Sequence, residues 1–252
     1  INILVSRNSE ARARGIRILE DILSIASNEI VEGYKKALGS KNAAVRKFAV
    51  EELGQLGDDN VISILVERMG DENFDVYEAA IGALKKLGAY ADQMVEGYKK
   101  ALVSKDAKVR KSAAEKLVEE LGRVERVGVI ESLIDRLSDE NLEIHKIAVK
   151  ALEELGASED HLVEGYKKAT GSKNAEVRKS AVVALGQLEL GEQRDAVVTK
   201  LMDQFLSDEN SEVRRLISQT LQQLQVTHEQ IIDHAINILV SRNSEARARG
   251  IR

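Results

Sequence analysis

Residues 30–57 read IVEGYKKALGSKNAAVRKFAVEELGQLG, and this stretch decides the fold class. Its first part places apolar residues at i, i+3, i+6 and i+7, which is one face of a helix: Val31, Tyr34, Ala37 and Leu38. Gly39 to Asn42 then interrupt the pattern with turn-forming residues. A second apolar stripe follows at Val45, Ala49, Leu53 and Leu56, and Gly57 supplies a helix stop. The stretch therefore predicts two antiparallel helices joined by a tight turn.

The same two-helix pattern recurs along the chain. The segment VEGYKKA occurs at 31–37, 95–101 and 163–169, and it alternates with Gly/Ser-Asp-Glu-Asn at 70–73, 138–141 and 207–210. Each unit also has an Asn or Asp four residues before a second marked position: Asn8/Arg12, Asn42/Arg46, Asn73/Tyr77, Asp106/Arg110, Asn141/His145, Asn174/Arg178, Asn210/Arg214 and Asn243/Arg247. The mean spacing of about 34 residues is typical of helical repeats. Because neither helix can bury its stripe alone, the units must stack.

We therefore expect a single all-α domain over residues 1–252, a right-handed α-solenoid of stacked antiparallel helix pairs. The expected full repeats are 28–58, 59–90, 91–123, 124–157, 158–191 and 192–226. Partial repeats are expected at 1–27 and 227–252, with a first helix from His228 to Val240 before the next turn.

Residues 44–57, AVRKFAVEELGQLG, resemble the second helix of a HEAT repeat, and most closely the short HEAT-like repeats first noted in phycobilin lyases. The resemblance covers essentially the whole chain, although Gly33, Gly97 and Gly165 stand where the family commonly has Pro. It implies that the second helices line a concave face. It also implies that the Arg of each pair is a structural ladder residue, bonded to acidic or amide side chains and turn carbonyls of adjacent repeats. Tyr77 and His145 replace this Arg, so we expect a weaker ladder there.

Residues 1–17 and 236–252 are identical, INILVSRNSEARARGIR. The sequence is thus either one period of a longer tandem array or an engineered piece whose end matches its start. Both copies begin with the apolar run Ile-Asn-Ile-Leu-Val, whereas terminal repeats normally present a polar outer face. Self-association through the chain ends, into a ring or a filament, is therefore an alternative function.

Composition excludes several classes of protein. The chain has 252 residues, a net charge of −5, no Cys, Pro or Trp, and only 3% aromatic residues. Without Cys it has no disulfide, thiolate-ligated metal or cysteine nucleophile. Its acidic charge and few aromatics disfavour nucleic acid as a partner. No apolar run is long enough for a membrane span, and residues 1–10 lack the pattern of a signal peptide, so the cytoplasm is the default location.

No motif identifies a reaction. The four histidines do not form H-E-x-x-H, no G-x-S-x-G occurs, and the Gly-Ser-Lys turns lack phosphate-loop spacing. We therefore assign no catalytic residue, no cofactor and no metal. A lyase-like enzyme is a further alternative that rests on the resemblance alone.

The two positions after the ladder residue offer a candidate binding surface for a protein or peptide. The first is basic in five of seven units, and the second is apolar in three, where desolvated anchors would carry interface energy. The expected partner-binding residues are Lys47, Phe48, Glu51, Lys111, Lys146, Ile147, Lys150, Lys179, Arg215 and Leu216. The alternatives are a solvated face with i, i+4 ion pairs and apolar side chains that pack under the neighbouring repeat. We expect a non-enzymatic protein-binding scaffold.

Overall fold

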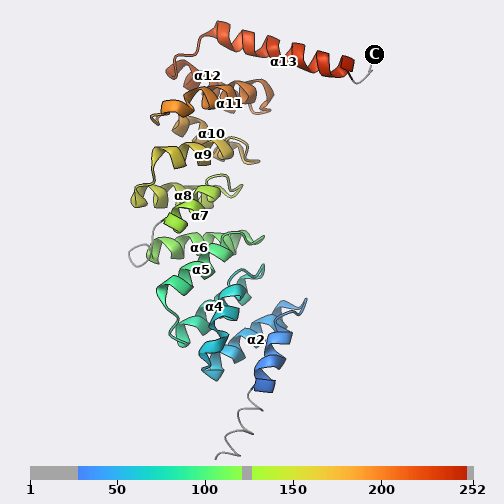
Figure 1. Ribbon diagram of the computed structural model, residues 1–252, viewed down its shortest axis with the longest axis vertical. Helices are drawn as coiled ribbons and strands as arrows, with labels where there is room; N and C mark the ends of the chain where they lie inside the picture. Colours follow the sequence, from blue (N-terminus) through green and yellow to red (C-terminus); the bar gives the residue numbers. More distant parts are fainter. Residues whose placement is uncertain (1–27, 121–126, 249–252) are drawn as a thin grey trace, which may run out of the picture. The chain divides into compact units, whose positions relative to one another are not determined.

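The computed structural model describes residues 28–120 and 127–248, and all regular structure in these ranges is helical (Figure 1). A helical segment over 28–37 precedes the labelled helices. These are α2 (Ala43–Leu56), α3 (Ile62–Arg68), α4 (Phe74–Lys86), α5 (Ala91–Ala101), α6 (Ala107–Glu120), α7 (Val127–Arg136), α8 (Leu142–Leu155), α9 (Glu159–Ala169), α10 (Ala175–Leu185), α11 (Arg194–Ser207), α12 (Ser211–Gln223) and α13 (His228–Ala248). Short 3-10 turns at Asp59–Val61 and Gly191–Gln193 precede α3 and α11.

The chain forms two compact units, Ile1–Val109 and Arg110–Arg252. In the first unit, α2 packs on α4, and α3 packs on both α4 and α5. In the second, first helices contact first helices, as in α7 with α9, and second helices contact second helices, as in α10 with α12. The prediction of an all-α stack of helix pairs is thereby confirmed within each unit. The expected partial repeat at 1–27 and the pair Asn8/Arg12 lie outside the described residues.

The second helices begin where the sequence predicts. The side-chain oxygen of Asn42 accepts a hydrogen bond from the backbone N–H of Ala44, and four further Asn residues cap their helices in the same way: Asn73, Asn141, Asn174 and Asn210. This bond satisfies a donor that the first helical turn leaves unpaired. Gly57 ends α2 in the left-handed conformation, with φ of 72°.

The core consists largely of the predicted apolar stripes, although two predicted members of the stripe on α2, Val45 and Leu56, are exposed. The position before each ladder residue is fully buried at Val76, Val109, Ile144, Val177 and Val213. Each VEGYKKA segment also contributes a tyrosine: Tyr98 and Tyr166 are buried, whereas Tyr34 is half-buried.

Helix α13 differs from the expected helix–turn–helix. It runs without a break through Asn243, where the preceding repeats have a capped turn. Helices gain most of their stability from packing, and α13 contacts mainly α11. None of the helices in the described ranges combines the length and apolar character needed to cross a membrane.

Candidate functional site

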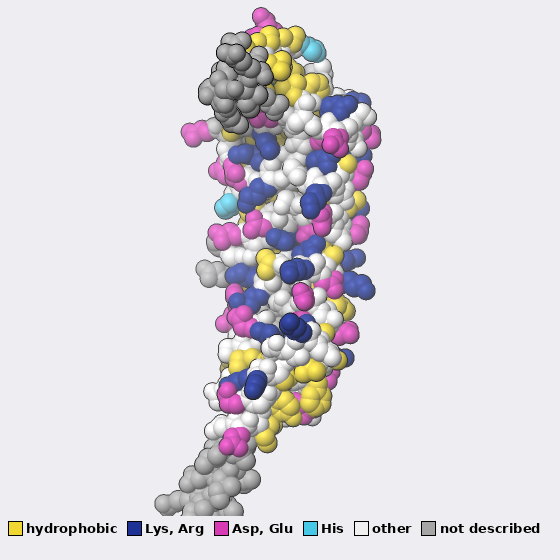
Figure 2. All heavy atoms as spheres, turned by 90° about the vertical axis from the view of Figure 1, so that its right-hand side faces the viewer, with side chains coloured by type: hydrophobic (Ala, Val, Ile, Leu, Met, Phe, Trp, Pro, Cys, Tyr) yellow, Lys and Arg dark blue, Asp and Glu magenta, His cyan; other side chains and the backbone are white. Residues whose placement is uncertain are grey.

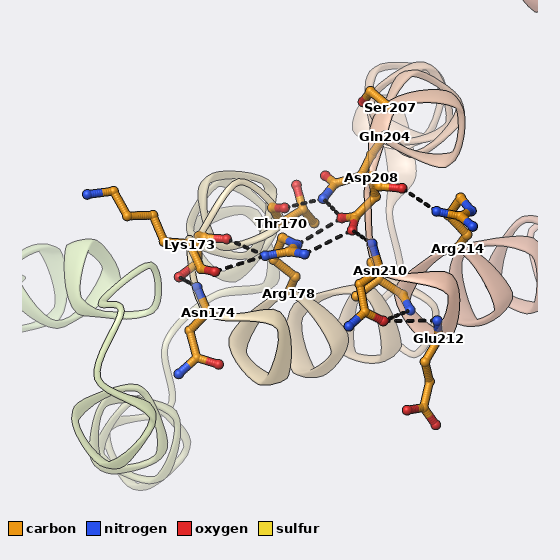
Figure 3. Close-up of polar contacts among 12 residues, drawn as sticks. Thr170, Lys173, Asn174, Arg178, Gln204, Ser207, Asp208, Asn210, Glu212 and Arg214 are labelled. Atoms are coloured by element: carbon orange, nitrogen blue, oxygen red, sulfur yellow. Dashed lines mark hydrogen bonds and ion pairs between the residues drawn. The ribbon is translucent and has the colours of Figure 1, made fainter.

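The ladder arginines join adjacent repeats. Arg178 donates from Nε and Nη2 to the carboxylate of Asp208 at 2.8 and 2.9 Å, and from Nη1 to the carbonyls of Ser172 and Lys173 (Figure 3). Arg46 makes the same bidentate contact with Asp71, at 2.7 Å for both bonds. Planar guanidinium groups suit such two-point pairing with carboxylates. The structural role predicted for these arginines is therefore confirmed.

The acidic partners were not predicted individually, although their motif was recognised. Asp71, Asp139 and Asp208 are the Asp of the Gly/Ser-Asp-Glu-Asn motif, and Arg110 pairs with Asp139 at 2.8 Å. Each Asp lies two residues before the capping Asn and also accepts its backbone N–H, as Asp208 does from Asn210 at 2.9 Å. The repeats with VEGYKKA have Ser at this position, so the ion pair forms at alternate junctions. The alternation of the two motifs in the sequence could have indicated that these ion pairs form only at every second junction.

His145 keeps an interhelix link at a junction where the ladder was expected to weaken. Its ring is buried, with Nδ1 2.7 Å from the carbonyl of Leu137 and Nε2 2.8 Å from the hydroxyl of Ser180 on α10. Burial lowers the pKa of His145, against the raising effect of the Leu137 carbonyl, and the charge of Lys146 lowers the pKa further. A neutral ring donates from Nδ1–H and accepts the Ser180 hydroxyl at Nε2. At His145 the expected ladder arginine is thus replaced by a histidine whose hydrogen bond to Ser180 joins α8 to α10. Tyr77, the other replacement, is fully buried.

The ten predicted partner-binding residues all lie on second helices, which together we call the second-helix face. Phe48, Glu51, Lys146, Lys150 and Arg215 are exposed, whereas Lys47, Lys111, Ile147, Lys179 and Leu216 are half-buried. Phe48 is the most exposed of the three apolar members, at 55%, and its ring contacts Tyr34 edge-on. Ile147 and Leu216 are partly covered, which favours the alternative that they pack under a neighbour.

Five of the six cations of this face pair with carboxylates. Lys146 pairs with Glu143 at 3.3 Å, and Lys179 pairs with Glu176 at 2.7 Å and with Glu212 on α12 at 3.3 Å. Further i, i+3 and i, i+4 pairs are Lys47–Glu51, Lys150–Glu154 and Arg215–Glu212. Pairs of this kind reduce the positive field available to a phosphate backbone.

A groove of about 570 Å³ opens between α8 and α10 on this face. His145 and Ser180 line it, and its apolar side chains are Leu142, Val149, Val183 and Ala184. Charged side chains of both signs also line it: Lys146, Glu153, Glu176 and Lys179. Lys146 and Lys179 were predicted as site residues. Val149 and Val183 were not predicted as site residues, although the spacing of apolar residues along the same helices could have indicated them.

The described residues contain no group of three or more His, Asp or Glu side chains placed to hold a metal ion. The groove offers apolar contact, hydrogen bonds and charges of both signs.

Comparison with known proteins identifies the repeats. The family model of HEAT repeats matches residues 1–85 and 130–222. Two similar solved structures are an engineered protein and the Escherichia coli protein YibA. The first is 22% identical over 77% of this chain and 96% of its own, with a TM-score of 0.35. The second is 21% identical over 90% of this chain and 91% of its own, with a TM-score of 0.38. No curated protein matches the sequence.

Proposed function

Because this chain belongs to the HEAT-repeat family, whose helical repeats form scaffolds, we propose that it is a non-enzymatic protein-binding scaffold. Its ligand is an extended peptide segment of a partner protein, held on the part of the second-helix face that α8 and α10 provide. The groove between α8 and α10 is the observation that carries this proposal.

The groove provides what a peptide segment requires. Val149 and Val183 offer apolar surface for one or two aliphatic side chains, whose burial would supply most of the affinity. Lys146 and Glu153 present opposite charges, which favour a ligand with mixed flanking charges and reject one of uniform charge.

A peptide-display selection on the purified chain tests the proposal. The peptides selected should bind the wild-type chain and lose at least roughly tenfold in affinity to Val183→Glu, because that change replaces apolar surface of the groove with a charged side chain. Val103→Glu is the matched control, since Val103 is an exposed valine outside the groove, and it should leave binding unchanged. Selected peptides that bind both variants equally well would refute the use of this groove.

A further inference from the structure

A glycine in the first helix of alternate repeats lets neighbouring first helices approach closely. A Cβ built on Gly97 of α5 would overlap the sulfur of Met69, and one on Gly165 of α9 would lie 2.5 Å from Cδ1 of Leu137. In both cases a large apolar side chain of the preceding repeat occupies the space that the glycine leaves. We call this arrangement a knob on a glycine notch.

Gly33 is a third glycine notch, but no large apolar side chain (the knob, as Met69 is for Gly97) fills it in the described residues. It occupies the same place in VEGYKKA as Gly97 and Gly165, yet no described atom lies within 4 Å of a Cβ built on it. The repeat that carries it is also open on its core side. Val45 is 40% exposed, whereas its counterparts such as Val76 are fully buried. Ile30, Phe48 and Leu56 add to this exposed apolar surface.

Helix α13 carries a knob in the matching register. Met69 and Leu137 each lie four residues before the capping Asn of their own repeat, Asn73 and Asn141. The residue four before Asn243 is Leu239, which is 67% exposed. It belongs to a stripe of exposed residues on one face of α13: Ile232, Ile236, Leu239 and Val240. Hydrophobic side chains gather both over residues 28–56 and around α13 (Figure 2).

The duplicated sequence indicates which side chain could fill the Gly33 notch. Residues 236–252 repeat residues 1–17, the segment that precedes the Gly33 repeat along the chain. Leu239 is therefore the sequence counterpart of Leu4, the residue whose place in the repeat is that of a knob for Gly33. A second copy of this chain thus carries, on α13, side chains with the register that Gly33 requires.

We propose that two copies of this chain associate head to tail, with Leu239 of one copy on the Gly33 notch of the other. The contact uses different surfaces on the two partners and leaves one of each free, so it propagates to larger assemblies. Leu4 of the same chain competes for the notch. The proposal does not depend on the peptide groove, since it uses none of the groove residues.

Two blocking variants test this arrangement. Gly33→Lys fills the notch, and the described residues leave room for the new side chain in the single chain. Leu239→Lys removes the knob and leaves Leu4 intact. Gly82→Lys is the matched control, because Gly82 is another helical glycine without a described neighbour within 4 Å. Circular dichroism should show that all three variants remain folded.

Sedimentation velocity over a roughly hundredfold concentration range gives the readout. The wild-type chain and Gly82→Lys should grow beyond the dimer as concentration rises. Each blocked variant alone should stay monomeric or associate roughly ten- to a hundredfold more weakly. An equimolar mixture of the two blocked variants should form a dimer and nothing larger, because Leu239→Lys still has a notch and Gly33→Lys still has a knob.

Three outcomes would overturn the proposal. A wild-type chain that stays monomeric throughout would show that no such contact forms, as would be the case if Leu4 fills the notch within its own chain. Dimers of either blocked variant alone, formed as readily as those of the wild-type chain, would indicate a symmetric contact instead. A mixture of the blocked variants that remains monomeric would exclude the pairing of Leu239 with Gly33.

Discussion

Replacing Arg178 by Met should destabilise the second unit strongly. The substitution keeps an apolar stem but removes both bonds to Asp208, whose side chain is only 2% exposed. Removing one partner of a buried ion pair typically costs about 3–5 kcal/mol, because the remaining charge is uncompensated. Asp208 keeps hydrogen bonds from Gln204 and from the backbone N–H of Asn210, so we expect a loss of about 3 kcal/mol.

Urea unfolding followed by circular dichroism measures this loss. Amide hydrogen exchange should accompany it, because repeat arrays do not always unfold in one step. The double variant Arg178→Met/Asp208→Asn should recover part of the stability, with a coupling of roughly 1.5–3 kcal/mol. Arg215→Met is the matched control: Arg215 is exposed and pairs only loosely with Glu212, so little change is expected.

The pH dependence gives an independent check. Burial raises the pKa of Asp208, but hydrogen bonds from Arg178, Gln204 and Asn210 outweigh burial and leave the pKa below its usual 3.8. Its contribution is therefore complete above pH 3.8 and is lost as pH falls through the lower, folded-state value. The difference in the free energy of unfolding between wild type and Arg178→Met should become smaller in that acid range. If Arg178→Met lost less than about 1 kcal/mol of unfolding free energy at neutral pH, the ion pair with Asp208 would not stabilise the unit as argued. A coupling energy near zero in the double variant would refute the argument in the same way.

Three further changes probe packing, capping and protonation. Gly54→Ala should destabilise the first unit by roughly 1–3 kcal/mol in urea unfolding, since its Cβ would lie 2.5 Å from that of Ala83. Gly82→Ala, which has no described neighbour within 4 Å, should stabilise the unit by about 0.5–1 kcal/mol. Equal effects of the two substitutions would contradict the packing argument. Asn174→Ala should cost about 1 kcal/mol in the same assay through loss of the α10 cap, and an unchanged urea midpoint would count against it. His145 has a lowered pKa in the fold, so stability should fall as pH drops below its unfolded value of 6.5 and level off below the folded one. Thermal melts of His145→Gln should show a shallower slope in this window, and an identical slope would exclude His145 as the source.

Much of the helical framework was predictable from local sequence. The capping role of Asn42 and its counterparts, the stop at Gly57 and the buried stripe of Val76 and its counterparts depend on residues within one repeat, so periodicity and turn chemistry are sufficient to locate them. The structural role of Arg46 and Arg178 followed from the family resemblance. Asp71 and Asp208 were not identified as their partners, because each pair joins residues 25 or 30 positions apart.

The candidate site was less predictable. Lys146 and Lys179 line the groove as residues of the predicted second-helix face, but Val149 and Val183 complete it only because α8 and α10 lie side by side. The exposed fractions of Phe48 and Ile147 differ although they hold the same repeat position. Exposure depends on what the neighbouring repeat places against a side chain, and that is a property of the stack.

The sequence by itself determined the helix pairs, their caps and their repeat, since these follow from residue spacing along one segment. Only the tertiary structure decided which charges pair between repeats, that His145 keeps its junction linked as a neutral ring, and that α13 continues through Asn243. It also decided that side chains of the preceding repeat fill the space beside Gly97 and Gly165, whereas no described atom fills the space beside Gly33. These features depend on contacts between segments distant in the chain, and short-range patterns do not specify the distances between such segments.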